Sequence, residues 1–320
     1  MKSSASVLLA CISLLLACGK ERISFNSFRE IALPSGDDPT AVWFSDSLNG
    51  VICGGKAWES GMIYSSSDGG QSWQVDTLLD RKMEHVSFDS RGRAYVCGQD
   101  QLLIREPGQA QWQVLRTDFQ WLRCAHFPTE KYGATVGGEG FHGGRLHVFG
   151  PNAFWQQDTL HDIDGELDAV WYADSTTLLA AGAGWVIRST DAGKSWERLR
   201  IENDIFTAIH FPTSQTGYLC GNQGSLYKTM NGGASWTKLR QGGSTGARHK
   251  PFRALWFKDA DTGWLVGDNG IFWQTNDGGD TWKSIENAPS DADFTDIFWI
   301  GNQGWATARG GRLFRMMNDE

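Results

Sequence analysis

Short segments in which apolar and polar residues alternate recur along the chain. Residues 206–239 show the pattern clearly: FTAIHFPTSQTGYLCGNQGSLYKTMNGGASWTKL contains four segments of four to six residues, separated by polar or glycine-containing turns. Alternation with a period of two, in segments rich in β-branched and aromatic residues, predicts strands. Because short turns join neighbouring segments, each unit predicts an antiparallel four-stranded meander.

Seven copies of this unit can be aligned. The first segment ends in an aromatic residue that recurs every 39 to 46 residues, at Phe44, Phe88, Phe127, Tyr172, Phe211, Phe257 and Trp299. The second segment recurs at 50–55, 93–98, 133–138, 178–182, 217–221, 263–267 and 304–308. A period of this length is typical of β-propellers, which remove exposed strand edges by closing into a ring.

The two ends of the repeat array indicate how the ring closes. The last copy stops after its third segment at 311–317, whereas FREIAL at 28–33 precedes the first copy and has the pattern of a fourth segment. We therefore predict an all-β fold: a seven-bladed β-propeller of four-stranded antiparallel blades, closed by an N-terminal strand that completes the last blade. The predicted propeller domain spans residues 25–320.

An eight-residue turn follows the third segment in four of the copies, at 66–73, 189–196, 229–236 and 275–282. Its recurring residues are Ser66, Asp68, Gly70, Trp73; Ser189, Asp191, Gly193, Trp196; Thr229, Asn231, Gly233, Trp236; and Thr275, Asp277, Gly279, Trp282. They match the S-x-D-x-G-x-x-W Asp-box of β-propellers, with threonine or asparagine substituted in places. Short polar side chains bond nearby backbone amides, glycine supplies a positive φ, and tryptophan packs over the turn. Repetition favours an architectural role over a metal or sugar site.

The N-terminus has the pattern of a secretory signal. One lysine precedes an apolar run at 7–17, which is too short to span a bilayer. The sequence LLAC at 15–18 resembles the lipobox of bacterial lipoproteins, in which the cysteine becomes lipidated; an ordinary signal peptide is the alternative. We expect residues 1–17 to be a signal peptide, Cys18 to carry the lipid and residues 18–24 to form a tether.

The residue after the cysteine predicts the location. Gly19 stands where an aspartate would suggest inner-membrane retention, so the resemblance points to the outer membrane. The expected location is the bacterial cell envelope, with the membrane contacted through a lipid anchor only.

Charge and cysteine spacing argue against two kinds of site. The 320 residues carry 29 basic and 37 acidic side chains, a net charge of −8, which argues against a nucleic-acid partner. Cys53, Cys97 and Cys220 occupy the same position in different copies, so they lie too far apart to form disulfides. With Cys124 they are expected to be free, buried thiols, and without a CxxC spacing we predict no metal site and no cofactor.

The whole mature chain resembles the photosystem II stability and assembly factor-like propellers, whose repeats read like TGWLVGDNGIFWQTNDGGDTW at 262–282. The resemblance implies a non-enzymatic protein that binds partner proteins during complex assembly, although photosystem binding itself does not transfer. It also implies a patch of basic residues just before the Asp-boxes. The matching residues are Arg105, Arg188, Lys228 and Arg315, whereas Ser65, Phe149 and Gln274 depart from the pattern. Packing of the arginine stems against a neighbouring blade is the alternative.

Asp-box propellers also include sialidases and xyloglucanase-like hydrolases. The arginine-containing strand motif of sialidases is absent, and the six tyrosines all occupy strand positions of the repeat. The hydrolases use two carboxylates across a cleft between two propellers, and this chain predicts one propeller. We therefore predict no catalytic residues.

Loops on the face opposite the Asp-boxes are the expected binding surface, because loop sequence varies freely over a rigid scaffold. The unusual loops are 54–61, 117–123, 137–145 and 240–253. They offer Trp58, Trp121, Phe141, His142, Arg145, Arg248, His249 and Lys250. Aromatic and arginine side chains are typical anchors of protein interfaces, and irregular solvated loops are the alternative.

Two further sets of residues have more than one interpretation. Trp43, Ser87, His126, Trp171, His210, Trp256 and Phe298 each precede a first-segment aromatic. They predict either a ligand-lined channel or, as we favour, core packing between blades. The segment DIDGELD at 162–168 lacks the oxygen spacing of a calcium loop, so we expect solvated acids there.

Two functional hypotheses follow. The first is a non-catalytic, lipid-anchored scaffold that binds partner proteins of unknown identity, in assembly or stabilisation of an envelope complex. The second is a glycan-binding or glycoside-hydrolase-like accessory lipoprotein. An exposed platform of Trp58, Trp121 and Trp185, or a narrow cleft with two facing carboxylates, would favour the second.

Overall fold

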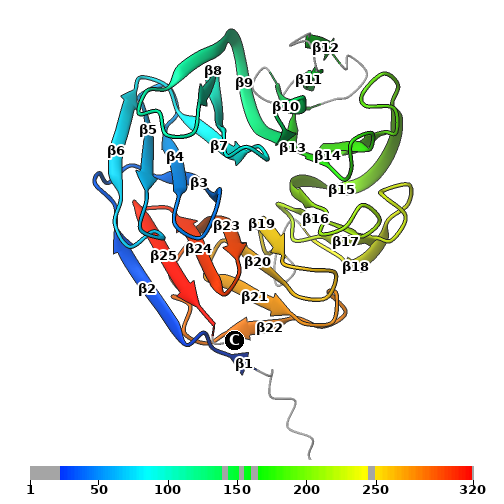
Figure 1. The fold of residues 1–320 in the computed structure, drawn as a ribbon. Helices are drawn as coiled ribbons and strands as arrows, with labels where there is room; N and C mark the ends of the chain where they lie inside the picture. The colour runs from blue at the N-terminus through cyan, green and yellow to red at the C-terminus, as the bar shows by residue number, and fades with distance from the viewer. Residues whose placement is uncertain (1–21, 139–142, 151–154, 160–164, 244–248, 319–320) are drawn as a thin grey trace, which may run out of the picture.

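The chain folds as an all-β propeller. The computed structural model describes residues 22–138, 143–150, 155–159, 165–243 and 249–318, and this part contains no helix. The strands stand around a central axis, and Figure 1 shows β3, β7, β13, β19 and β23 nearest that axis. The prediction of an all-β propeller is therefore confirmed.

The strands form five hydrogen-bonded sheets. One contains β3 (Pro39–Phe44), β4 (Gly50–Lys56), β5 (Ser60–Ser66) and β6 (Gln74–Leu79). A second contains β7 (Met83–Phe88), β8 (Ala94–Arg105), β9 (Gln113–Thr129), β10 (Tyr132–Gly138), β11 (Arg145–Phe149) and β12 (Trp155–Thr159). A third contains β13 (Leu167–Tyr172), β14 (Leu178–Ser189), β15 (Glu197–His210), β16 (Gly217–Gly221), β17 (Leu226–Thr229) and β18 (Thr237–Arg240).

The other two sheets involve the N-terminal segment. One contains β19 (Phe252–Phe257), β20 (Gly263–Gly267), β21 (Ile271–Thr275), β22 (Lys283–Ile285) and β1 (Arg22–Ile23). The last contains β23 (Phe294–Ile300), β24 (Gln303–Ala308), β25 (Arg312–Met317) and β2 (Ser27–Ala32). β1 pairs with β22 in parallel, so residues 22–23 of the predicted tether form a short strand.

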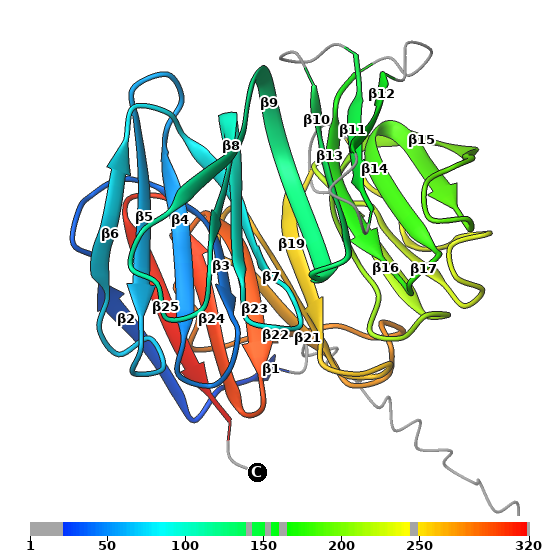
Figure 2. The ribbon, with the colours of Figure 1, turned by 45° about the horizontal axis from the view of Figure 1, so that its top comes forward.

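The prediction of seven separate four-stranded blades is wrong. Four of the repeats are joined in pairs, because single strands run from one repeat into the next and produce six-stranded sheets. β9 has 17 residues and pairs with β8 along its first half and with β10 along its second; Trp121 lies opposite both Gln99 and Gly138. β15 joins β14 to β16 in the same way. The segment 117–123, predicted as a loop, therefore lies inside β9, which Figure 2 shows as one long strand.

The predicted closing pair is present. β2 pairs antiparallel with β25, with Ser27 opposite Met317 and Ala32 opposite Arg312. Figure 1 shows this N-terminal strand in blue beside the C-terminal strand in red. The edge of the C-terminal meander is thus covered by the N-terminal segment, as the repeat pattern indicates.

Aromatic stacking joins neighbouring repeats. An aromatic residue on the second strand of one repeat stacks on the first-strand aromatic of the following repeat. The pairs and their centroid distances are Tyr95–Phe127 at 3.8 Å, Tyr218–Phe257 at 3.5 Å, Trp264–Trp299 at 4.1 Å and Trp305–Phe44 at 3.7 Å. The last of these pairs joins the two ends of the ring. Stacked pairs add about 0.5–1.5 kcal/mol beyond the burial of their area.

A glycine opposite the first-strand aromatic makes room for its ring. Gly263 pairs with Phe257 across two strands, and a Cβ added to it would lie 2.4 Å from the ring. Gly217 has the same relation to Phe211, at 2.5 Å. These glycines explain why the second segment begins with glycine in several copies.

Candidate functional site

The Asp-box side chains bond the backbone of their own turns. The hydroxyl of Ser66 accepts the Gly70 N–H at 2.9 Å, and Thr229 does the same for Gly233 at 3.0 Å. Asp68 Oδ1 accepts the N–H groups of residues 71 and 72, and its Oδ2 accepts the Ser72 hydroxyl at 2.6 Å. The Ser72 hydrogen bond is the main cause that lowers the pKa of Asp68 to about 2. All these contacts lie within the turn.

The tryptophan of the turn packs on the first-strand aromatic. Trp73 meets Phe44 edge to face at 5.8 Å, and Trp282 meets Phe257 in the same way at 6.0 Å. The Asp-box geometry therefore positions a core side chain.

The basic residues before the Asp-boxes reach the next repeat. Arg188 Nε donates to the Gly232 carbonyl at 2.7 Å, and Lys228 Nζ donates to the Gly278 carbonyl at 2.8 Å. Arg315 Nε donates to the Gly69 carbonyl at 2.8 Å. Arg105 instead pairs with Asp76 of its neighbour. Because each of these side chains is engaged across a repeat boundary, the alternative of packing against a neighbour describes their geometry better than a free basic patch.

The predicted partner-binding residues do not all lie together. Trp58 and Trp121 lie together, with ring centroids 5.7 Å apart. Lys250 lies elsewhere, 5.4 Å from the Trp273 ring, and His249 beside it is exposed. Arg145 begins β11. Phe141, His142 and Arg248, like Cys18 and the signal segment, lie outside the described residues.

Trp58 is held in an unusual conformation. It lies in the turn between β4 and β5, is 62% exposed and has a φ of 63°, in the left-handed region that tryptophan rarely adopts. Its N–H donates to Gln99 Oε1 at 2.9 Å, and that same oxygen accepts the Lys82 N–H at 3.2 Å. Gln99 is fully buried, so it fixes the turn from below. Such backbone strain costs about 1–3 kcal/mol and persists only when surrounding contacts impose it.

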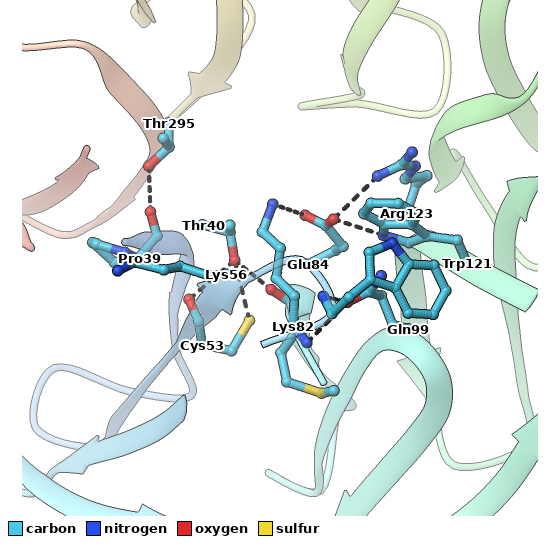
Figure 3. A network of polar contacts seen from close by, with 12 residues as sticks. Pro39, Thr40, Cys53, Lys56, Lys82, Glu84, Gln99, Trp121, Arg123 and Thr295 are labelled. Carbon is cyan, nitrogen blue, oxygen red and sulfur yellow. Dashed lines mark hydrogen bonds and ion pairs between the residues drawn. The ribbon is translucent and has the colours of Figure 1, made fainter. Parts of the chain in front are cut away.

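A charged network surrounds Trp121 (Figure 3). Arg123 lies over the Trp121 ring at 3.8 Å, and Trp121 Nε1 donates to Glu84 Oε1 at 2.7 Å. Arg123 bridges two acids, with Nη1 3.1 Å from Glu84 and Nη2 2.8 Å from Glu166. Lys82 also pairs with Glu84, at 2.9 Å. Glu166 and Asp168 are thus part of the propeller interior, and the prediction of solvated acids in this segment is wrong for Glu166, which is buried.

This network borders a central channel of about 850 Å³. Residues of β3, β7, β9, β13, β15, β19 and β23 line it. Ala57 in the turn between β4 and β5, Ala183 in β14 and Arg309 in the turn between β24 and β25 also line it. Ala57 belongs to the predicted loop 54–61, so one of the predicted loops borders the channel.

A ring of polar residues lines the channel, one from each first strand: Thr40, Glu84, Arg123, Asp168, Thr207, Arg253 and Thr295. Each is skipped in the strand pairing, as a β-bulge residue is; in β3, for example, Pro39 and Ala41 have partners and Thr40 does not. The threonines bond the next repeat: Thr40 donates to the Met83 carbonyl at 2.8 Å and Thr295 to the Pro39 carbonyl at 2.8 Å. We name these seven residues the bulge ring.

The bulge ring was not predicted from the sequence. Its members lie three positions before the residues that were singled out, since Thr40 precedes Trp43 and Asp168 precedes Trp171 by that interval. The signal in the sequence was a polar or charged residue (Thr, Glu, Arg or Asp) at the same position of the otherwise apolar first segment in every copy.

An aromatic floor lies deeper in the channel. Trp43, Trp171, His210, Trp256 and Phe298 line it. The ring centroid of Trp171 lies 4.0 Å from that of His126 and 4.5 Å from that of His210, and the Trp256 centroid lies 4.4 Å from that of His210. Burial lowers the pKa of both His126 and His210 to about 3, so both are neutral at pH 7. The rings pack together, as the favoured interpretation predicts, and most of them also line the channel.

Two carboxyl groups in the channel have raised pKa values. Burial is the main cause that raises the pKa of Asp168 to about 7, and the nearby Glu166 adds to it. Burial also raises the pKa of Asp296 to about 7, although its Oδ2 accepts the Val42 N–H at 2.9 Å. In the described ranges, no group of three or more His, Cys, Asp or Glu side chains could hold a metal ion.

A second hollow, of about 840 Å³, lies beside the first Asp-box. Its charged residues include Asp76 and Arg105, which pair with each other.

The four described cysteines lie in strands and are buried and free. Among the residues that the structure places, none form a helix able to span a bilayer.

The closed ring, the repeated turns and the channel define a β-propeller with a ligand-sized central opening. The chain is similar to the photosystem II assembly lipoprotein Ycf48 of Trichormus variabilis, with 26% identity over 192 residues, 54% of this chain and 53% of that protein. It is 41% identical over 189 residues to the photosystem II assembly protein Ycf48 of Thermosynechococcus vestitus, covering 52% of this chain and 51% of that protein. The chain thus spans about half the length of the curated relatives it matches. No protein-family model matches it.

Solved structures share the fold over most of the chain. YCF48 from Cyanidioschyzon merolae gives a TM-score of 0.71 at 16% identity, covering 91% of this chain and 98% of that one. YCF48 bound to D1 peptide gives 0.72 at 18% identity, covering 94% and 98%. The WD40 propeller domain of Doa1 gives 0.70 at 10% identity, covering 93% and 97%. The predicted resemblance to photosystem II assembly factor propellers is confirmed by the sequence matches, and the structural matches show the propeller fold.

Proposed function

We propose that this propeller is a non-catalytic, lipid-anchored scaffold that binds partner proteins at the mouth of its channel, in assembly or stabilisation of a complex of the bacterial cell envelope. Trp58 carries the proposal. It is a large, exposed aromatic residue that buried Gln99 holds in place next to Trp121. Rigid aromatic side chains beside a concave site are typical anchors of protein interfaces, because little conformational entropy is lost when they bind.

The similar proteins support a polypeptide as the ligand. Both curated relatives are photosystem II assembly proteins, and one of the similar solved structures is a YCF48 bound to D1 peptide. The proposed anchor is Cys18, on the strength of the LLAC sequence at 15–18, and the proposed location is the outer membrane. The proposed partner is a protein of the cell envelope and not a photosystem.

The aromatic geometry gives no support to a sugar platform. The rings of Trp58 and Trp121 meet at 77°, so they do not form one flat surface. Trp185 lies on β14 beside Arg200 and is not part of the channel lining. A protein partner therefore fits the exposed aromatic pair better than a glycan.

Crosslinking and mass spectrometry in the native host test the proposal. Trp58→Ala should reduce the recovered partner crosslinks by at least about tenfold, because loss of a central anchor costs about 2 kcal/mol or more. Met230→Ala is the matched control, since Met230 is 74% exposed but follows Thr229 in an Asp-box turn, on the other face. Equal partner recovery with the two variants would contradict the proposal.

A further inference from the structure

The basic residues of the bulge ring are already neutralised. Arg123 is shared between Glu84 and Glu166 and stacks on Trp121. Arg253 donates Nε and Nη2 to Asp268 at 2.8 and 2.6 Å, and its Nη1 to Asn222 at 2.9 Å. These guanidinium groups therefore have little capacity left for an anionic ligand.

The acids of the channel are not neutralised to the same extent. Glu166 is only 7% exposed, yet its Oε2 has no hydrogen-bond partner in the part of the chain that the structure describes. Within those same ranges, Asp168 and Asp296 form no ion pair, and the hydrogen bond of Asp296 comes from a backbone N–H. A buried carboxylate oxygen without a partner is costly, so Glu166 Oε2 indicates a missing donor.

The floor beneath these acids suits a positive charge. The faces of Trp43, Trp171 and Trp256 carry the negative side of the ring quadrupole, which attracts cations. His210 lines the same channel and is 4% exposed, and its Nδ1 has no partner among the described residues. A neutral imidazole can accept a hydrogen bond from a cationic donor.

The channel favours an organic cation over a metal ion, because no group of three or more His, Cys, Asp or Glu side chains among the described residues could hold a metal. A channel of about 850 Å³ accommodates a long side chain. The exposed Ile205 lines it, and the exposed Trp58 lies against the lining residue Trp121, so the two offer an apolar surface for the backbone that carries the side chain.

We propose that the channel receives a lysine or arginine side chain from the partner protein, with the cationic group paired to Glu166 and Asp168 above the tryptophan floor. The inference rests on the proposed function, because it requires a polypeptide at the channel mouth. It adds the chemistry that selects the partner: a protruding cationic residue flanked by apolar residues.

Fluorescence polarisation with decapeptide pools tests the inference on the purified protein. Each pool is random except at one central position, which is Lys, Arg, norleucine or Glu. The Lys and Arg pools should bind at least about tenfold more tightly than the norleucine and Glu pools, since charge-assisted hydrogen bonds contribute about 1.5–3 kcal/mol. Free spermidine is titrated in parallel, and tighter binding of spermidine than of the Lys pool would overturn the assignment to a protein side chain.

Variants separate this inference from the proposed function. The Glu166→Gln, Asp168→Asn double variant should lose the preference for Lys and Arg, while Glu59→Gln, an exposed acid of the same face outside the channel, should keep it. Trp58→Ala should weaken all pools alike and leave the preference intact. If the double variant fails to fold, as judged by near-ultraviolet circular dichroism, the single variant Asp168→Asn replaces it. Equal binding of the Lys and Glu pools, no binding of any pool, or a preference that survives the channel variants would overturn the inference, whereas the crosslinking experiment decides the proposed function independently.

Discussion

Trp305 offers the sharpest test of how the ring is held closed. Its side chain is fully buried, its ring stacks on Phe44 at 3.7 Å, and its Nε1 donates to the Gly69 carbonyl at 3.3 Å. The contact therefore joins the last repeat to the first. The matched residue at an ordinary boundary is Trp264, which is 1% exposed and stacks on Trp299 at 4.1 Å.

The expected loss of stability follows from these contacts. Trp305→Ala removes a buried indole and leaves a cavity, which typically costs about 3–5 kcal/mol of unfolding free energy. Trp305→Phe keeps an aromatic ring on Phe44 and loses the hydrogen bond, so it should cost less, about 1–2 kcal/mol. If the ring unfolds as one cooperative unit, Trp264→Ala should cost the same as Trp305→Ala to within about 1 kcal/mol.

Urea unfolding of the purified variants, followed by tryptophan fluorescence and by far-ultraviolet circular dichroism, measures these differences. Coincident transitions from the two probes are expected for every variant. A loss below about 1 kcal/mol for Trp305→Ala would refute the reasoning. An early separate transition confined to β2 and β25, detected by hydrogen exchange, would also refute it, because the closure would then be a weak local contact.

Three further changes test other features of the fold. Gly263→Ala places a Cβ 2.4 Å from the Phe257 ring and should cost about 1–3 kcal/mol, whereas Gly36→Ala meets no atom within 4 Å and should leave the urea midpoint nearly unchanged. Asp296 has a folded pKa raised from 3.8 to about 7, so the folded state binds a proton that the unfolded state does not, and wild-type stability falls as the pH rises through this interval. Asp296→Asn lacks this loss, and its unfolding free energy relative to wild type should be at least about 1 kcal/mol higher at pH 8 than at pH 5; an equal difference at both pH values would contradict the assignment. Cys18→Ala should move the protein from the detergent phase to the aqueous phase in Triton X-114 partitioning, and an unchanged distribution would count against the lipid anchor.

The repeat could be predicted from the sequence, and the division into sheets could not. Turns, strands and the closing strand at 28–33 follow from local alternation and from glycine positions, which act within a few residues. Whether one strand ends before the next begins depends on continued hydrogen bonding with two different neighbours. The residues TDFQWLR at 117–123 carry no turn signal that decides this, and they continue β9 without a break.

Part of the surroundings of the channel was predicted, and the chemistry of its lining was not. Trp58 and Trp121, both predicted as loop residues, lie together, although Trp121 is in strand β9. The bulge ring was missed because a bulge interrupts the alternation of inward and outward residues, so the period of two no longer tells which side chain points into the channel. Asp168 therefore resembles an ordinary surface acid in the sequence.

Three kinds of contact between repeats run in one direction along the chain. The aromatic stacks, the threonines of the bulge ring and three of the basic residues (Arg188, Lys228 and Arg315) reach from one repeat to the following one. Trp305, Thr295 and Arg315 reach from the end of the chain back to its beginning. Each repeat thus presents one set of side chains to the preceding repeat and a different set to the following repeat. A circular permutant, which preserves every neighbour, should keep the fold, whereas exchanging two repeats would set mismatched sides against each other.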